Sequence, residues 1–217
     1  SNSGGTGSIP PQTENITPNL IVRDSYLPGI PVLVRVELLN DDGTINRNLW
    51  DAEARLSVAG NPNITLSTNR VTMYNGLGSA LVSFDGTGDF TLDVEVNGTS
   101  TSKVLADWSG EPVQAVSGNV AISQTWSGIY HITGGDLTIS SGAILTLNPG
   151  TLVLIDGVSS GSNGTDIDVA GSIQSLGTAA SPVTITAFTP GRNFGELHHD
   201  NAATSTFLYT NITQAGR

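Results

Sequence analysis

The segment Glu196-Leu197-His198-His199-Asp200 holds the densest group of side chains that could do chemistry. If it forms a β-strand, Glu196, His198 and Asp200 point to one side and His199 to the other. Histidine and carboxylates together can bind a metal ion or transfer protons. These three residues are therefore the candidates for a catalytic site. A solvated strand edge or the corner of a coil is the alternative explanation, and the motif H-E-x-x-H is absent.

Two groups of aspartates are candidates for calcium binding, because Ca²⁺ takes oxygen ligands clustered on loops. The first group is Asp41 and Asp42, and the second is Asp156, Asp166 and Asp168. Neither has the spacing D-x-D-x-D-G of a dedicated calcium loop. Asp-Gly and Asn-Gly are also the usual residues of tight turns. Calcium binding and turn formation therefore both stay open.

Aromatic side chains offer a third kind of site, since an exposed ring can stack on a sugar. The candidates are Trp50, Tyr74, Trp108, Trp126 and Tyr130. Their wide separation along the chain favours core or interdomain packing instead. The sequence has no phosphate-binding loop and no dinucleotide-binding glycine pattern. It therefore gives no support for nucleotide chemistry.

Composition limits the elements that could position these residues. The 217 residues include 26 glycines, 10 prolines and a single lysine, Lys103, and only 12% are charged. Long exposed helices normally carry many Glu/Lys pairs, which a chain with one lysine cannot supply. Short strands joined by turns are therefore expected. The net charge of −11 opposes binding to nucleic acid or anionic lipid. The sequence has no run of about 18 apolar residues, so no membrane span is expected. The absence of cysteine excludes disulfides and is compatible with export.

The first half of the chain predicts a β-sandwich. Residues 1–15 have the composition of a flexible linker, and period-two alternation begins at residue 16. Val34, Val36 and Leu38 are expected on one face of a strand. A second alternating run lies within Leu49–Ala59, for which a helix is the competing interpretation. Several short strands over residues 16–106 predict an immunoglobulin-like sandwich.

A resemblance supports this assignment. The segment Gly78–Val96, which reads GSALVSFDGTGDFTLDVEV, resembles the closing hairpin of bacterial immunoglobulin-like modules. Apolar residues alternate in both Ala80–Phe84 and Phe90–Val96, and together with the resemblance this predicts that the two strands form a hairpin. Residues 107–118, which are rich in turn formers, are expected to be a linker.

Beyond the expected linker the periodicity changes. Gly134, Gly142 and Gly150 recur every eight residues, and short apolar strands follow them. The expected strands are Leu137–Ile139, Ile144–Leu147 and Leu152–Ile155, then Ile167–Val169, Ile173–Leu176 and Val183–Ile185, with a third cycle beginning at Phe207–Tyr209. Three strands per cycle predict a right-handed parallel β-helix over residues 119–217.

The same region resembles the opening coils of secreted bacterial parallel β-helix proteins of the pectin-lyase-like fold. The matching segments are WSGIYHIT from Trp126, LTISSGAILTLNPGT from Leu137 and GSIQSLGTAASPVTIT from Gly171. The resemblance implies that more coils follow, so a C-terminal fragment of the same polypeptide is an expected partner, and a cut at Arg217 would suit a trypsin-like protease. Lyases of this fold pair a basic residue with carboxylate-bound Ca²⁺, which makes Arg192 a further candidate.

The fold hosts lyases, glycosidases, adhesins and spacers alike, so it leaves function open. The expected function is a non-catalytic, extracellular or cell-surface segment that displays, spaces or attaches a larger modular protein. The first alternative is the N-terminal part of a polysaccharide lyase or glycoside hydrolase. The second is a carbohydrate-binding module. A polysaccharide or a surface protein is the expected ligand in each case.

Overall fold

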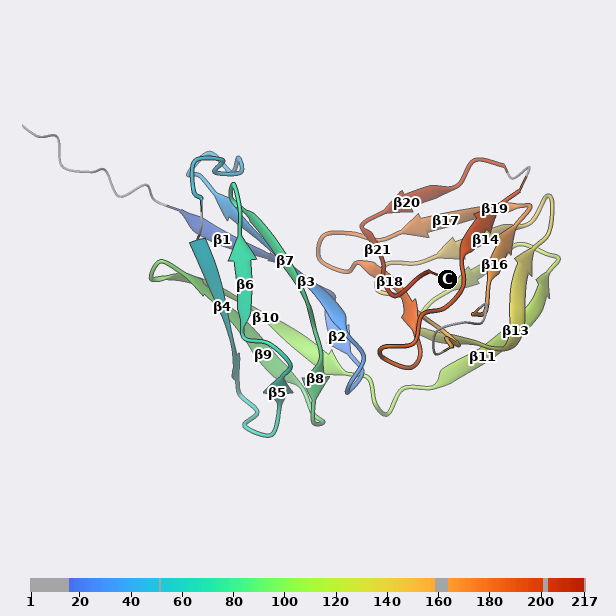
Figure 1. Cartoon of the computed structure of the whole chain (residues 1–217), viewed down its shortest axis with the longest axis horizontal. Coiled ribbons are helices and arrows are strands. Elements are labelled where there is room, and N and C mark those ends of the chain that lie inside the picture. The colour runs from blue at the N-terminus through green and yellow to red at the C-terminus, as the bar shows by residue number, and fades with distance from the viewer. Residues whose placement is uncertain (1–15, 51, 159–163, 201–202, 217) are drawn as a thin grey trace, which may run out of the picture.

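The computed structural model of the chain describes residues 16–50, 52–158, 164–200 and 203–216, and these residues form an all-β fold. The expected linker 1–15 lies outside the described residues, as does Arg217. Within the described part of the chain, no helix is long and apolar enough to cross a membrane. Figure 1 shows two β-rich halves side by side, with β1 to β10 in one half and β11 to β21 in the other.

The N-terminal half consists of two packed, mostly antiparallel sheets (Figure 1). The three-stranded sheet has the order β1 (Thr17–Ile21), β3 (Val32–Leu39), β7 (Leu77–Val82). The five-stranded sheet has the order β2 (Ser25–Tyr26), β10 (Thr99–Asp107), β9 (Phe90–Val96), β4 (Ala52–Ala59), β6 (Arg70–Met73). A short pair, β5 (Thr65–Leu66) with β8 (Phe84–Asp85), completes this half.

Alternation of apolar and polar residues explains these strands. Val34, Val36 and Leu38 of β3 are fully buried, and they share one core with the inward residues of the five-stranded sheet. In β4, Ala54 and Leu56 are buried while their neighbours are exposed. The competing interpretation of this segment as a helix was therefore wrong, because a period of two suits a strand with one buried face.

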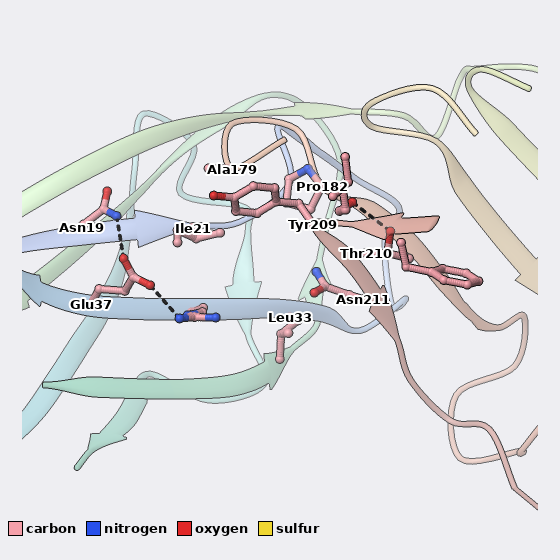
Figure 2. A pocket seen from close by; sticks show the side chains of 12 residues that line it. Asn19, Ile21, Leu33, Glu37, Ala179, Pro182, Tyr209, Thr210 and Asn211 are labelled. Atoms are coloured by element: carbon pink, nitrogen blue, oxygen red, sulfur yellow. Dashed lines mark hydrogen bonds and ion pairs between the residues drawn. The ribbon is translucent and has the colours of Figure 1, made fainter. Parts of the chain in front are cut away.

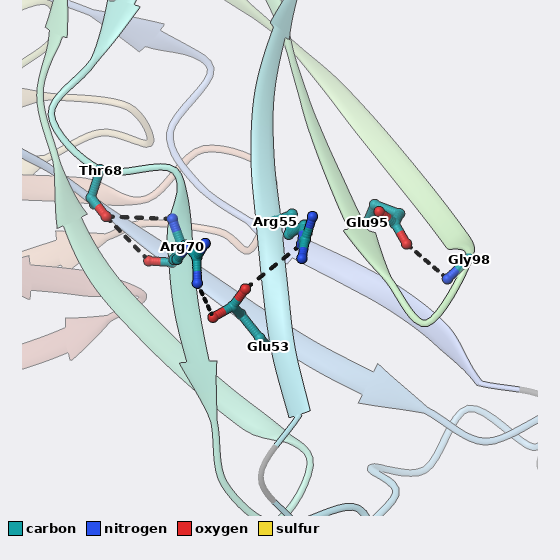
Figure 3. Close-up of polar contacts among 6 residues, drawn as sticks. All are labelled: Glu53, Arg55, Thr68, Arg70, Glu95 and Gly98. Carbon is teal, nitrogen blue, oxygen red and sulfur yellow. Dashed lines mark hydrogen bonds and ion pairs between the residues drawn. The ribbon is translucent and has the colours of Figure 1, made fainter.

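The expected hairpin between Ala80–Phe84 and Phe90–Val96 is also wrong. β7 pairs with β3, whereas β9 pairs with β4 and β10 in the other sheet. The hairpin is instead β9–β10, closed at Asn97 and Gly98, whose φ angles of 51° and 83° suit the two-residue turn that Asn-Gly favours. Glu95 accepts a hydrogen bond from the Gly98 N–H at 2.8 Å (Figure 3).

The C-terminal half consists of parallel strands in three stacks, which we call A, B and C. Stack A contains the first parts of β11 (Val113–Val120) and β13 (Ile129–Ile139), then β15 (Leu152–Ile155), β18 (Val183–Ala187) and β21 (Thr210–Ile212). Stack B contains the second parts of β11 and β13, then β16 (Ile167–Val169) and β19 (Leu197–His199). Stack C contains β12 (Gln124–Trp126), β14 (Ile144–Leu147), β17 (Ser172–Leu176) and β20 (Thr206–Leu208).

The chain visits the three stacks in turn, so equivalent residues of successive circuits lie above one another. Tyr130, Val153 and Ile185 form one such buried ladder in stack A. Trp126 stacks on Tyr130 with ring centroids 4.1 Å apart and fills the core at the first circuit. β11 begins at Val113, so the segment 107–118, expected to be a linker, contains part of a strand that pairs with β13.

Candidate functional site

The two halves meet along the outer side of stack A. Ile30 from the sandwich packs against Ile129, Leu152 and Leu154, which point away from the core of the stacks. Trp108 packs against the same group. This third apolar cluster therefore joins the two larger cores through side chains that would otherwise be exposed.

Arg23 lies inside this contact and is only 1% exposed. Its Nη2 donates to the Gly150 carbonyl at 3.0 Å, its Nε donates to the Ser25 carbonyl at 2.7 Å, and its guanidinium lies 5.0 Å from the Trp108 ring. Burial lowers the pKa of Arg23 to about 10, with Asp24 acting in the opposite direction. A buried guanidinium is tolerated only where such contacts replace its water. Arg23 therefore ties the sandwich to the stacks.

Two further polar contacts cross the same boundary. Asp24 accepts a hydrogen bond from the Ser181 hydroxyl at 2.9 Å. The Lys103 ammonium donates to the Val22 carbonyl in the sandwich and to the Ala180 carbonyl in the stacks. Burial, opposed by Asp24 and aided by Arg23, lowers the pKa of Lys103. Both cations of this boundary thus bind carbonyl oxygens of the C-terminal half.

Beside this contact lies a cleft of about 560 Å³, shown in Figure 2. Its floor is the outer face of the three-stranded sheet, and its opposite wall is the corner between β20 and β21 with Ala179 and Pro182. Arg35 and Glu37 on the floor form an ion pair of 2.7 Å, and the Asn19 amide donates to Glu37 at 3.2 Å. Tyr209 on the wall is 56% exposed.

A second cleft, of about 550 Å³, continues along the same sheet face. Leu33 and Arg35 line both clefts, so the two are contiguous. Tyr74 lines the second cleft and is 60% exposed. We call this continuous surface, from Tyr209 across β3 to Tyr74, the sheet groove.

The predicted catalytic residues lie in the last circuits of stack B. The backbone N–H of Glu196 donates to Asp166 at 2.7 Å, and that of Asp166 donates to Asp136 at 2.9 Å, each 30 residues apart. His198 lies 3.5 Å from Asp168, and the N–H of Asp200 donates to the Val169 carbonyl. The structure therefore brings His198 to Asp168 and gives Asp166 a hydrogen-bonding role at a corner. A catalytic role for Glu196, His198 and Asp200 stays a prediction.

The calcium candidates have protein partners of their own. Asp42 accepts hydrogen bonds from the hydroxyl and the N–H of Thr44, which lower its pKa, and Asp41 is an exposed residue of the same turn. Asp156 binds His131 and Thr133. Among the residues that the structure describes, no three His, Asp or Glu side chains form a group that could hold a metal ion. Calcium binding stays a prediction.

One polar cluster was missed from the sequence. His131 Nε2 lies 2.7 Å from Asp156, Thr133 donates to the other oxygen of Asp156 at 2.5 Å, and the His131 ring stacks on Phe188 at 4.0 Å. Burial raises the pKa of Asp156, but the hydrogen bonds from Thr133 and His131 and the charge of His131 outweigh it, so the pKa lies below its ordinary value. The members come from different circuits, so no local motif reveals them.

The candidate aromatic residues separate into two groups. Trp126 and Tyr130 are buried in the core of the stacks, and Trp108 lies at the contact between the halves. Trp50 and Tyr74 are exposed at 65% and 60%. The expectation of core or interdomain packing is thus confirmed for the first three and wrong for the last two. Tyr209 and Phe207, which the sequence gave no reason to select as ligand-binding aromatic residues, line the first cleft together with Arg35 and Leu33.

No family model and no curated protein matches the chain. Among solved structures, a β-glucuronidase of Parabacteroides merdae is 19% identical with a TM-score of 0.32, and the match covers 42% of this chain and 12% of that enzyme. The ZirS C-terminal domain is 12% identical with a TM-score of 0.32, covering 49% of this chain and 80% of that domain. Domains 4 and 5 of the S-layer protein SbsC are 12% identical with a TM-score of 0.31, covering 43% and 53%. Similarity this low carries no functional inference.

Proposed function

We propose that the chain is a non-catalytic structural segment of an exported protein, in which an immunoglobulin-like sandwich is docked against the side of a parallel β-helix. Two antiparallel sheets around one core support the first assignment. Three parallel stacks that the chain visits in turn support the second. Such a segment spaces or displays the other parts of a surface protein.

The buried Arg23 contact is the observation that carries this proposal. Separating the halves would require breaking its hydrogen bond to Gly150 and exposing the apolar contact of Ile30 with Ile129, Leu152 and Leu154. A sandwich held in one orientation transmits position and force, which a freely jointed pair of units does not. A fixed angle therefore suits a spacer or display role.

The composition of the chain is compatible with export. It has no cysteine that an oxidising environment could cross-link and carries a net charge of −11. Protease treatment of intact source cells tests directly whether the protein lies on the cell surface. The chain is degraded if it lies on the surface and survives if it is inside the cell.

The docked arrangement can be measured with spin labels, because the absence of native cysteines makes labelling specific. Ser57 and Ser141 are exposed, one in each half, so the double variant Ser57→Cys/Ser141→Cys reports the distance between them. We expect one narrow distance distribution. Arg23→Ala should broaden it, whereas Arg55→Ala, which removes an exposed arginine of β4, should not. A broad distribution in the otherwise native chain would contradict the proposal.

A further inference from the structure

The sheet groove has one exposed tyrosine near each end and a floor of mixed polar and apolar residues between them. Tyr209 belongs to the stacks and Tyr74 to the sandwich, and Leu33 and Arg35 join the two clefts. In Figure 2, Tyr209 lies across the first cleft from Leu33, with Asn19 and Glu37 further along the floor. Ring faces bind the C–H surface of a pyranose, and amides and hydroxyls bind its oxygens.

Tyr209 is held in an uncommon backbone conformation. Its φ angle is 38°, a left-handed value that is unfavourable for a bulky residue. The Tyr209 carbonyl accepts from the Val183 N–H at 3.0 Å, and the Thr210 hydroxyl binds the Leu208 carbonyl at 2.9 Å. Gly177 leaves room for this corner, because a Cβ there would overlap the carbonyls of Tyr209 and Leu208. The ring is therefore presented to the cleft by a rigid corner whose strain the surrounding bonds support.

The charges of the groove compensate each other. Arg35 is paired with Glu37, and Asn19 binds the same carboxylate. The opposite face of the sandwich also carries ion pairs, which join Glu53 to Arg55 and Arg70 (Figure 3). The whole chain, at −11, repels polyanions. A neutral chain with many hydroxyls fits this surface better than an acidic polysaccharide or a nucleic acid.

We propose that the sheet groove binds an uncharged polysaccharide, with one sugar stacked on Tyr209 and another on Tyr74. The inference rests on the docked arrangement proposed above, because the two tyrosines belong to different halves. The polysaccharide bridges the halves and crosses β3 between the rings, over Leu33 and the Arg35–Glu37 pair.

Affinity gel electrophoresis of the full chain tests this inference with β-glucan, xyloglucan, galactomannan and starch as neutral probes and polygalacturonate as the acidic probe. We expect at least one neutral polymer to retard the chain. Tyr209→Ala and Tyr74→Ala should each weaken retardation about tenfold, the loss expected when a central aromatic contact is removed. Phe188→Ala is the matched aromatic control, since Phe188 is 43% exposed and lines neither cleft. Arg55→Ala is the charge control.

Three results would overturn the inference. The first is no retardation by any neutral polymer, or retardation by polygalacturonate alone. The second is retention of full binding by either tyrosine variant. The third is self-association of the chain that Tyr209→Ala abolishes, which would assign the groove to a second copy. The spin-label distance distinguishes failure of the polysaccharide proposal from failure of the docked arrangement. A narrow distance distribution without polysaccharide binding would contradict the polysaccharide proposal and leave the docked arrangement supported.

Discussion

At the scale of single residues, the corner of stack B depends on Gly195. A Cβ at this position would overlap the Asp166 carboxylate that accepts from the Glu196 N–H, and it would lie 2.9 Å from the Gly164 carbonyl. Gly195→Ala should therefore lower the free energy of unfolding by about 1–3 kcal/mol through a lost hydrogen bond and a steric conflict. Urea denaturation measures this loss. Gly110→Ala, where a Cβ meets nothing within 4 Å, should change it little.

The His131–Asp156 cluster predicts a dependence of stability on pH. The pKa of Asp156 is lowered in the folded protein, so its ionised form stabilises the fold above the ordinary pKa of 3.8. This contribution is lost as pH falls below that value and the folded carboxylate becomes protonated. Asp156→Asn should therefore lower the denaturation midpoint at pH 7 and have less effect at pH 3.

The matched variant Asp41→Asn removes the same charge from an exposed turn. It should leave the difference between the midpoints at pH 7 and pH 3 as in the native chain. An equal effect of Asp156→Asn at the two pH values would contradict a stabilising role for the ionised carboxylate.

At the scale of elements, β12 and β13 close the first circuit of the stacks around Trp126. Trp126 is 2% exposed and stacks on Tyr130. Trp126→Ala should cost about 3–5 kcal/mol, the range found when a buried Trp or Phe is truncated to Ala. Denaturation followed by circular dichroism measures this. Trp50→Ala removes the same side chain from an exposed position, and its effect should stay within about 0.5 kcal/mol.

The sequence predicted the positions of the strands better than it predicted which strands pair with each other. The strand segments around Ile144–Leu147, Leu152–Ile155 and Ile167–Val169 were found because each carries apolar residues between glycine corners. β11 was missed as an element because only Val120 of its eight residues is buried, so the strand lacks a regular alternation of apolar and polar residues. The pairing of β9 with β10 was missed because local alternation does not specify the partner strand.

The candidate sites were predicted less well, for a physical reason. His198 and Asp168 meet because stacking places residues one circuit apart in register. The sheet groove needs Arg35, Tyr74 and Tyr209, which lie in three distant parts of the chain. Such sites depend on tertiary contacts, and a single sequence carries no local pattern for them.

At the scale of the whole molecule, two cores are joined by one small apolar cluster. Among the described residues, the sandwich core and the stack core have no member in common, and Ile30 with Ile129, Leu152 and Leu154 connects them. Arg23 and Lys103 add hydrogen bonds across the same boundary. The stability of each half should therefore depend on the other, and the two should unfold in one cooperative transition.

Ile30→Asp tests this coupling, because it places a carboxylate in the apolar contact beside Leu152 and Leu154. We expect differential scanning calorimetry to show one transition for the native chain and two for the variant, since an uncoupled sandwich and an uncoupled stack unfold at their own temperatures. Ile122→Asp is the matched control at a residue that is 79% exposed, and it should keep one transition. Two transitions in the native chain would mean that the contact between the halves is too weak to fix their orientation, and the spacer role would lose its physical basis.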